Sequence, residues 1–310
     1  MSQPVHLDDD VVASLLDPDE VTATVEAAFT AWGSDQAATT QRVRAMTSAG
    51  MASGMAAVVP PFSGGKVYAT RNGVFTFVVV LFDLDGNLLC TLDGDVLTQA
   101  RTPAASAIAI RRLAAPDAEI AALVGTGRQS WAHTRMLAAE LPNLRELRIA
   151  GVVPEQVAAL LERARAAGIP AVAATDADAA ATDAHVIVTI TQSPEPVFSA
   201  SSVADHALVC AVGATKYDRC EIPPELVGRC AAVVCDDVVG SRVECGDLIR
   251  AAAEGHFDWS NAIEFHAVCA GRAEVARAGS APVLFETQGV ALQDVAVAGL
   301  AWQRFTATRS

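Results

Sequence analysis

Three basic side chains, Arg42, Lys66 and Arg101, are conspicuous in a chain with 22 Lys and Arg against 36 Asp and Glu. Each lies beside residues typical of turns or of the ends of helices and strands. A guanidinium binds a carboxylate through two parallel hydrogen bonds, and a lysine partly desolvated near two arginines has a lowered pKa. An anionic substrate of so acidic a chain would need a local cluster of Arg and Lys, and these three residues are candidates for it. Any one of them alone would be interpreted as a solvated surface residue.

The segment from Glu119 to Ser130 contains a second candidate site. An apolar run, Ile120–Val124, ends at Gly125, a second glycine follows at Gly127, and a helix-favouring run begins at Ser130. Gly125 permits a tight turn, and Gly127 lets a pyrophosphate approach the backbone at the positive end of the helix. Ser130 replaces the third glycine of the usual fingerprint. The segment predicts dinucleotide binding, and the alternative is an ordinary glycine-rich turn.

The region after residue 116 alternates between predicted strands and helices, which indicates a parallel sheet of the Rossmann type. The clearest helix runs from Pro154 to Ala167 and is stopped by Gly168 and Pro170. The predicted strands are Ile120–Val124, Leu147–Val152, Ala171–Ala174, Val186–Ile190, Leu208–Val212 and Ala231–Cys235. The fold class is therefore α/β, with a nucleotide-binding domain over residues 116–287.

The first third of the chain has a different pattern, which predicts an α+β domain with an antiparallel sheet. A helix begins after Asp17, which caps it. The run Lys66–Tyr68 is a predicted strand, and Val74–Phe82 is apolar enough to be central. A second helix is expected to open at Arg101, with Thr98 or Thr102 as its cap, and to end at Leu113. A late strand, Pro282–Phe285, precedes a last helix, Val290–Trp302, which is expected to return to this domain, giving limits of 1–115 with 288–310.

Composition narrows the classes of partner. The chain has 310 residues, is 52% hydrophobic and 19% charged, and has a formal net charge of −14. That charge argues against nucleic acid or an anionic membrane as a partner, and no apolar run is long enough for a membrane span. The seven cysteines and six histidines form no metal-binding spacing, so no metal is expected. An acidic N-terminus without a signal-peptide pattern and scattered cysteines predict a cytoplasmic protein.

Several motifs together resemble the ornithine cyclodeaminase/μ-crystallin family. The resemblance extends from about Arg42 to Asp294 in the family's order and spacing. The motifs are Gly65-Lys66-Val67, Leu97-Thr98-Gln99-Ala100-Arg101-Thr102 with Ala104-Ala105-Ser106, Gly125-Thr126-Gly127-Arg128-Gln129-Ser130, Ala211-Val212-Gly213-Ala214 with Glu221-Ile222, and Gly289-Val290-Ala291-Leu292-Gln293-Asp294. The resemblance implies a homodimeric NAD(P)-dependent enzyme that acts on a small α-amino or α-imino acid.

The resemblance also assigns roles to residues. Arg42 and Arg101 would hold the substrate carboxylate, with Thr102 beside them, and Lys66 would lie at the reacting carbon–nitrogen centre. Arg44 is the competing candidate for the first arginine, and Arg42 is preferred because it gives the family spacing to Lys66. The cofactor would contact Gly125, Thr126, Gly127, Arg128, Gln129, Thr191, Val212, Gly213, Thr287 and Gln288. Thr191 and Gly213 are equally compatible with ordinary strand ends, and Asp294 with a cap or pair within the last helix.

Two departures from the family pattern qualify these expectations. Thr215 stands where cyclodeaminases carry an aspartate that handles the amine, so the chain is closer to the ketimine-reductase branch. The predicted second strand, Leu147–Val152, lacks at Gly151 the acid that binds the ribose hydroxyls, which slightly favours NADPH over NADH, with Arg128 as the candidate for the 2′-phosphate. The leading expectation is a reductase or dehydrogenase of a cyclic ketimine carboxylate. The alternatives are a cyclodeaminase that recycles bound NAD and a nucleotide-binding protein that has lost catalysis.

Overall fold

The computed structural model describes residues 5–71 and 74–308 and divides the chain into two compact units. Unit 1 comprises Met1–Ala105, Cys269–Arg272 and Gly289–Ser310, and unit 2 comprises Ser106–Val268 and Ala273–Gln288. The domain limits predicted from the sequence stay a prediction. Within the described ranges, no helix combines the length and the apolar character needed to cross a membrane.

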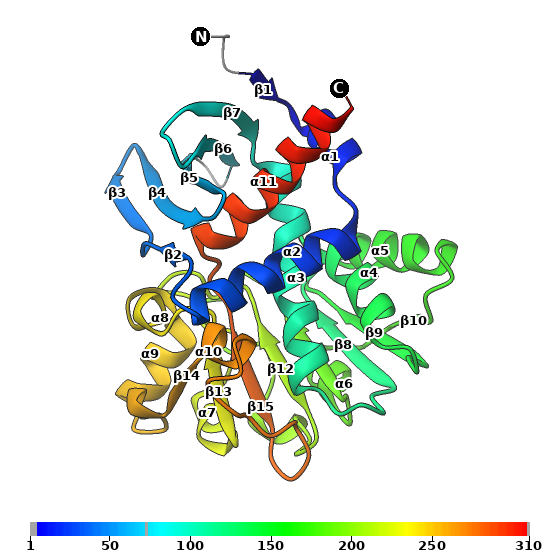
Figure 1. Ribbon diagram of the computed structural model, residues 1–310. Coiled ribbons are helices and arrows are strands. Elements are labelled where there is room, and N and C mark those ends of the chain that lie inside the picture. The colour runs from blue at the N-terminus through cyan, green and yellow to red at the C-terminus, as the bar shows by residue number, and fades with distance from the viewer. Residues whose placement is uncertain (1–4, 72–73, 309–310) are drawn as a thin grey trace. The chain divides into compact units, whose positions relative to one another are not determined.

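Unit 1 is built on a seven-stranded sheet in the order β1-β7-β6-β5-β4-β2, with β3 paired to β4. Its strands are β1 (Val5–Leu7), β2 (Ala38–Thr39), β3 (Val43–Thr47), β4 (Gly50–Val59), β5 (Phe62–Arg71), β6 (Val74–Asp83) and β7 (Leu88–Asp93). The unit also contains the helices α1 (Asp9–Leu15), α2 (Pro18–Gly33) and α11 (Ala291–Ala307) and the first part of α3 (Asp95–Leu113), up to Ala105. Helix α11, red in Figure 1, packs against β4, β5, β6 and α2.

The start of α2 and the place of β6 agree with the sequence, whereas the hairpin of β3 and β4 was missed. Asp17 caps α2 by accepting hydrogen bonds from the N–H groups of Asp19 and Glu20. Strand β6 lies between β5 and β7. The residues of β3 and β4 are rich in Gly, Ala and Met, which have little preference for strands. Strand β4 forms nonetheless because it pairs with β5 from Met51 to Val59, and this tertiary pairing outweighs the weak local preference.

Helix α3 (Asp95–Leu113) begins earlier than predicted and corrects the placement of Arg101. Arg101 lies inside the helix rather than before it, and so does Pro103. The hydroxyls of Thr98 and Thr102 donate to the carbonyls of Gly94 and Thr98, one helical turn back, so neither residue caps the helix. The expectation that the helix opens at Arg101-Thr102-Pro103 is wrong, because the N–H that Pro103 lacks does not end a helix that tertiary packing supports.

Unit 2 contains an eight-stranded sheet in the order β10-β9-β8-β11-β12-β15-β13-β14, in which neighbouring strands run parallel. Its strands are β8 (Ile120–Val124), β9 (Glu146–Ala150), β10 (Ala171–Ala173), β11 (Val186–Thr189), β12 (Leu208–Ala211), β13 (Ala232–Cys235), β14 (Ala262–Glu264) and β15 (Val283–Glu286). The chain winds outward from β8 to β10 and then resumes on the other side at β11. This is the doubly wound order of a Rossmann-type sheet, and the predicted fold class is confirmed.

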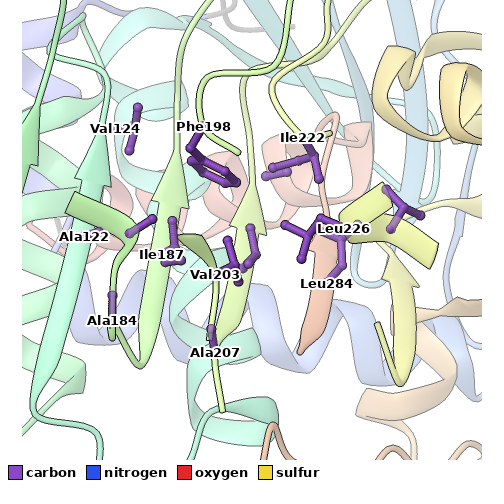
Figure 2. Close-up of a cluster of buried hydrophobic side chains, with 14 of the residues drawn as sticks. Ala122, Val124, Ala184, Ile187, Phe198, Val203, Ala207, Ile222, Leu226 and Leu284 are labelled. Carbon is purple, nitrogen blue, oxygen red and sulfur yellow. The ribbon is translucent and has the colours of Figure 1, made fainter. Parts of the chain in front are cut away.

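Helices connect these strands. They are α4 (Ser130–Glu140), α5 (Pro154–Ala166), α6 (Ala177–Ala181), α7 (Pro224–Arg229), α8 (Val238–Glu244), α9 (Gly246–Ala253) and α10 (Phe265–Cys269). A core of buried apolar residues joins them to the sheet, and Figure 2 shows Ile187 on β11, Leu284 on β15, Phe198 and Leu226 among its members. Many of its members are alanine or valine, and their small side chains let helix and sheet approach closely.

Candidate active site

Lys66 is the centre of the candidate site in unit 1. It lies on β5, directly opposite Met55 on β4, and is 1% exposed. Its Nζ donates hydrogen bonds to Thr98 Oγ1 at 2.5 Å and to Asp294 Oδ1 at 3.0 Å. The same atom lies 4.5 Å from the centre of the Phe77 ring. A lysine amine that is buried this deeply is stable only where hydrogen-bond acceptors and an opposite charge replace the water that it has lost.

The surroundings of Lys66 tune its proton affinity. The pKa of Lys66 is lowered from 10.5 to about 8, mainly by burial; Asp294 opposes this shift, and the positive charges of Arg101 and Arg42 contribute to it. A pKa near the working pH lets one amine both release and accept a proton. The direction of this shift is the one expected from the sequence.

Arg101 reaches the same place from α3. Its Nε donates to Asp294 Oδ1 at 3.3 Å and its Nη1 donates to Gln293 Oε1 at 2.9 Å. Gly289 passes beside the guanidinium with φ +78°, and a Cβ atom there would lie 2.5 Å from Arg101 Nη1. Only glycine meets both demands, because other residues rarely adopt this φ and a side chain would displace the guanidinium.

Arg42 precedes β3 and approaches the same group from the sheet. Its Nη2 donates to the carbonyl oxygen of Gly289 at 2.7 Å and lies 3.9 Å from Met55 Sδ. The structure therefore brings Arg42, Lys66 and Arg101 together within unit 1. Thr102 is also nearly buried, but its hydroxyl is engaged by the backbone of α3.

The sequence analysis missed Asp294 as a member of this cluster. Asp294 lies in α11, is fully buried, and its Oδ1 accepts from both Lys66 and Arg101. Its partners come from β5 and α3, so the interpretation as a cap or pair within the last helix is wrong. The signal was indirect: buried cations require an anion, and Asp294 lies in the predicted last helix, Val290–Trp302, at the end of the matching motifs.

The glycine-rich loop of unit 2 has the geometry expected for phosphate binding. Gly125 has φ +116°, and a Cβ atom there would lie 2.9 Å from the Ile190 carbonyl oxygen. Apart from its own chain neighbours, no atom of the described residues lies within 4 Å of the Cβ position of Gly127, so the backbone is open to a ligand. Ser130 begins α4 and donates through Oγ to the Gly127 carbonyl at 2.7 Å. The N-terminus of α4 therefore lies next to the exposed backbone of Gly127, as a phosphate site requires.

The other predicted cofactor residues follow neighbouring strands of the same sheet. Thr191 follows β11, Val212 and Gly213 follow β12, and Thr287 and Gln288 follow β15. Carboxyl ends of parallel strands on either side of the switch between β8 and β11 form the binding edge of such sheets. The Thr287 hydroxyl donates to Asp236 at 2.7 Å, and the Gln288 side-chain oxygen accepts from Ser241 at 2.7 Å.

Glu221 links the segments that follow β11 and β12 at this edge of the sheet. The sequence analysis did not assign it a functional role. Its carboxylate accepts from the backbone N–H groups of Thr191 at 2.5 Å and Gly213 at 2.6 Å. A Cβ atom on Gly213 would lie 2.6 Å from Glu221 Oε2, so the glycine leaves room for the carboxylate. Burial and the charge of Asp247 raise the pKa of Glu221 to about 7, against the opposing effect of these hydrogen bonds.

Two further buried carboxyl groups, Asp247 and Glu286, lie beside the Cys245 thiol. Burial raises the pKa of Asp247 to about 6, and burial together with Asp247 raises the pKa of Glu286 well above its usual range. The ligand atoms of the three residues lie within 4.8 Å of one another, a spacing that could suit a metal ion. The Cys245 thiol already donates to Glu286 at 3.3 Å, and protonation is sufficient to neutralise the acids.

The tip of β9 carries no charge that could contact a ribose. A Cβ atom on Gly151 would lie 2.8 Å from the Thr126 side chain, and Val152 is 99% exposed. The Thr126 hydroxyl donates to Gln156 Oε1 at 3.2 Å, which holds it in that place. The missing acid at Gly151 therefore has a steric reason.

The order of strands, the glycine-rich turn and the buried lysine site define an α/β protein with a Rossmann-type unit. Residues 3–309 match the model of the ornithine cyclodeaminase/mu-crystallin family, and the chain belongs to that family. The family expected from the motifs is confirmed.

The chain is similar to reductases and to solved structures of this family. The chain is 33% identical over 225 residues to a Delta(1)-pyrroline-2-carboxylate/Delta(1)-piperideine-2-carboxylate reductase of Azospirillum brasilense, covering 73% of this chain and 68% of the relative. The structure of a probable ornithine cyclodeaminase from Bordetella pertussis is 34% identical with a TM-score of 0.93, covering 99% and 98% of the two chains. The iminosuccinate reductase of Paracoccus denitrificans in complex with NAD+ is 26% identical with a TM-score of 0.91, covering 99% and 97%.

Proposed function

We propose that the protein is an NAD(P)H-dependent reductase of a small α-imino acid, with a cyclic ketimine carboxylate as its substrate. The expected class of activity is confirmed by reductase relatives such as the Azospirillum protein. The observation that carries the assignment to residues is Lys66, which is buried between two arginines and one carboxylate with a pKa of about 8.

A nicotinamide cofactor fits unit 2. The open backbone at Gly127, the free approach to the start of α4 and the strand ends fastened by Glu221 form a suitable cradle. Bound NAD(P)H supplies a hydride for the imine carbon. The residues that would hold it are Gly125 to Gln129, with Thr191, Val212, Gly213, Thr287 and Gln288 along the edge.

The chain's own residues supply binding and the proton. Arg42 and Arg101 bind the substrate carboxylate, with Thr102 at the edge of this clamp, and Asp294 keeps Arg101 and Lys66 in place. Lys66 Nζ gives a proton to the imine nitrogen, directly or through a water molecule. The carbon–nitrogen double bond gains one hydride and one proton and becomes a secondary amine, and Lys66 is reprotonated from solvent.

The two alternatives have weaker support. Ornithine cyclisation needs an anionic base for the ammonium group, and Thr215 cannot supply one. A protein that has lost catalysis has no need to keep a buried lysine between two arginines, because burying charges is costly.

We favour NADPH slightly over NADH. The uncharged tip of β9 lacks the acid that would repel a 2′-phosphate, and exposed Arg128 lies in the glycine-rich loop. Calorimetry with each cofactor is the test. Clearly tighter binding of NADH would overturn this preference, and binding of neither would support the alternative without catalysis.

We also propose a homodimer formed through unit 1. Helix α11 covers one face of the sheet, whereas the other face exposes Val43, Val58, Val67 and Val78. A shallow groove of about 830 Å³ on that face is lined by small and apolar residues that include Ala56 and Val67. A second copy of the same sheet offers a matching apolar surface. A cytoplasmic location stays a prediction.

The activity is tested by mixing purified protein with NADPH or NADH and Δ1-pyrroline-2-carboxylate while nicotinamide absorbance is followed. The proposal expects cofactor oxidation that depends on the imino acid and yields proline. Ammonia release from ornithine with catalytic NAD, without imine reduction, would establish the cyclodeaminase alternative instead.

A further inference from the structure

Thr98, in the first turns of α3, lies between the Lys66 amine and the backbone of Gly94. Its Oγ1 accepts a hydrogen bond from Lys66 Nζ at 2.5 Å and donates one to the Gly94 carbonyl oxygen. The same carbonyl accepts from the Thr98 N–H at 3.1 Å. A hydroxyl has one proton to donate, so a Thr98 hydroxyl that donates to Gly94 faces Lys66 only as an acceptor.

Contacts with β6 and α1 fix the place of Gly94. Its N–H donates to the Phe77 carbonyl oxygen at 3.2 Å, and a Cβ atom on Gly94 would lie 2.7 Å from Phe77 Cβ. In the next turn, the N–H of Val96 donates to Asp9 Oδ1 at 2.9 Å. The direction in which the Thr98 hydroxyl points is therefore set by the fold and does not depend on the protonation state of Lys66.

Two acceptors hold the Lys66 amine. Its N–H bonds reach Thr98 Oγ1 at 2.5 Å and Asp294 Oδ1 at 3.0 Å, and the Phe77 ring centre lies 4.5 Å from Nζ. The ammonium form keeps one further N–H bond. In the neutral form the lone pair takes the place of that bond, because neither the Thr98 hydroxyl nor the Asp294 carboxylate offers it a proton. Proton exchange therefore uses the same direction in both forms.

A neutral acceptor suits the charge balance around Lys66. Burial lowers the pKa of Lys66 most, and Asp294 on α11 raises it. The charges of Arg101 on α3 and Arg42 before β3 lower this pKa as well. The Thr98 hydroxyl stabilises the ammonium form by a hydrogen bond without adding a negative charge. A second carboxylate in its place would weaken the attraction of the two arginines for the substrate.

We propose that Thr98 is a positioning residue for proton transfer: oriented by the Gly94 carbonyl, its hydroxyl holds the Lys66 amine so that the remaining N–H bond faces the imine nitrogen. The inference rests on the proposed imine reduction at Lys66. The Nζ–H bond breaks, its proton forms the new bond to the imine nitrogen, and its electron pair stays on Nζ as the lone pair. The hydride of NAD(P)H goes to the imine carbon. Thr98 keeps its own proton and acts only through Lys66.

The test begins with Thr98→Val, which keeps the branched shape of the side chain and removes the oxygen. The reaction is the reduction of Δ1-pyrroline-2-carboxylate by NAD(P)H. We expect kcat to fall by about tenfold to a hundred-fold, because a reacting group misplaced by about 1 Å loses rate on this scale. The KM for the imino acid should stay within about threefold, because the arginines that bind its carboxylate are kept.

The pH profile separates positioning of the amine from a general structural effect. Loss of a hydrogen bond to the ammonium form disfavours that form, so the alkaline limb of kcat/KM should move about one pH unit lower in Thr98→Val. Damage to packing alone would lower the rate at every pH and leave the limb in place.

Three further variants complete the design. Thr98→Ser keeps the acceptor, so it should retain the wild-type limb and a kcat within about threefold of the wild type. Thr22→Val is the matched control in unit 1, because Thr22 is 7% exposed and donates to the Pro18 carbonyl one turn back at 2.9 Å. It should leave kcat and the limb unchanged. Thr98→Ala replaces Thr98→Val if the valine variant does not fold, and the same results are expected of it.

The outcomes separate this inference from the proposed function. Wild-type kcat in Thr98→Val, a lowered kcat with an unmoved limb, or an equal loss in Thr98→Ser would overturn the role of Thr98 alone. The same loss and the same movement of the limb in Thr22→Val would do so as well. A wild type that reduces no imine would overturn the proposed function and this inference with it.

Discussion

Lys66 and Asp294 form the pair on which the proposed chemistry depends. Burial favours the neutral amine, Asp294 favours the ammonium, and the two arginines oppose Asp294. The balance leaves the pKa of Lys66 at about 8, so both protonation states are populated near neutral pH. A carboxylate that binds Lys66 and Arg101 through one oxygen also fixes the distance between proton donor and carboxylate clamp.

Removing the amine tests its role as proton donor. Lys66→Ala should lower turnover by roughly a hundred-fold to ten-thousand-fold, the usual contribution of a general acid. Cofactor affinity, measured by calorimetry, should change little because Lys66 belongs to unit 1. Full activity in this variant would mean that another group supplies the proton.

The pH profile tests the influence of Asp294. Imine reduction needs protonated Lys66, so kcat/KM should fall as the pH rises through about 8. Asp294→Asn removes the group that raises the pKa of Lys66, so the alkaline limb should move to lower pH. Asp19→Asn, at an exposed position of α2, is the control and should leave the limb in place. An unmoved limb in Asp294→Asn would assign it to another group.

Elements were predicted from the sequence where local pattern and tertiary context agree. The strand Ile120–Val124 was placed at its observed ends, and α5 ends one position before the predicted Ala167. Both are bounded by strong signals, Gly125 for the strand and Pro154 for the helix. The β3–β4 hairpin and the true start of α3 depend on partners distant in sequence, which local patterns do not contain.

The candidate site shows the same division. The basic residues and the glycine-rich loop are visible because their residue types are unusual for their surroundings. Asp294 and Glu221 are common residue types, and only the fold places them beside Lys66 and Gly213. Arg44 on β3 lies directly opposite Ser53 on β4 because of the strand register, which the sequence did not predict for this hairpin.

The junction of β15 with α8 and α9 should make stability depend on pH. The folded-state pKa values of Glu221 and Glu286 are raised, so the folded chain keeps protons that the unfolded chain releases. Their contribution is fully present below the unfolded value of about 4.3 and is lost as the pH rises through about 7 and beyond. Glu286→Gln should raise the free energy of unfolding above pH 7 by roughly 1 kcal/mol or more.

Urea unfolding across a pH series measures this effect. The loss of stability with rising pH should be smaller in Glu286→Gln than in the wild type. Glu155→Gln, at an exposed position of α5, should behave as the wild type does. A parallel decline in Glu286→Gln would show that Glu286 does not hold a proton in the folded state.

At the scale of the whole molecule, the exposed face of the unit 1 sheet bears on assembly. Val67→Asp places a charge on this face, where Val67 is 59% exposed in the single chain. If two copies associate there, burying the new carboxylate is costly and sedimentation should show a shift from dimer to monomer. Val152→Asp, on the fully exposed tip of unit 2, should leave the dimer intact. A monomeric wild type at micromolar concentration would exclude the proposed dimer.

The most direct test of the central claim follows the hydride. The protein is incubated with NAD(P)H carrying deuterium at C4 of the nicotinamide, in each of its two configurations, and with Δ1-pyrroline-2-carboxylate. Mass spectrometry of the proline then reports whether deuterium reaches the α-carbon. The account predicts one deuterium per proline formed from one of the two labelled cofactors, and a large loss of this product in Lys66→Ala. Unlabelled proline from both cofactors, or no proline at all, would contradict it.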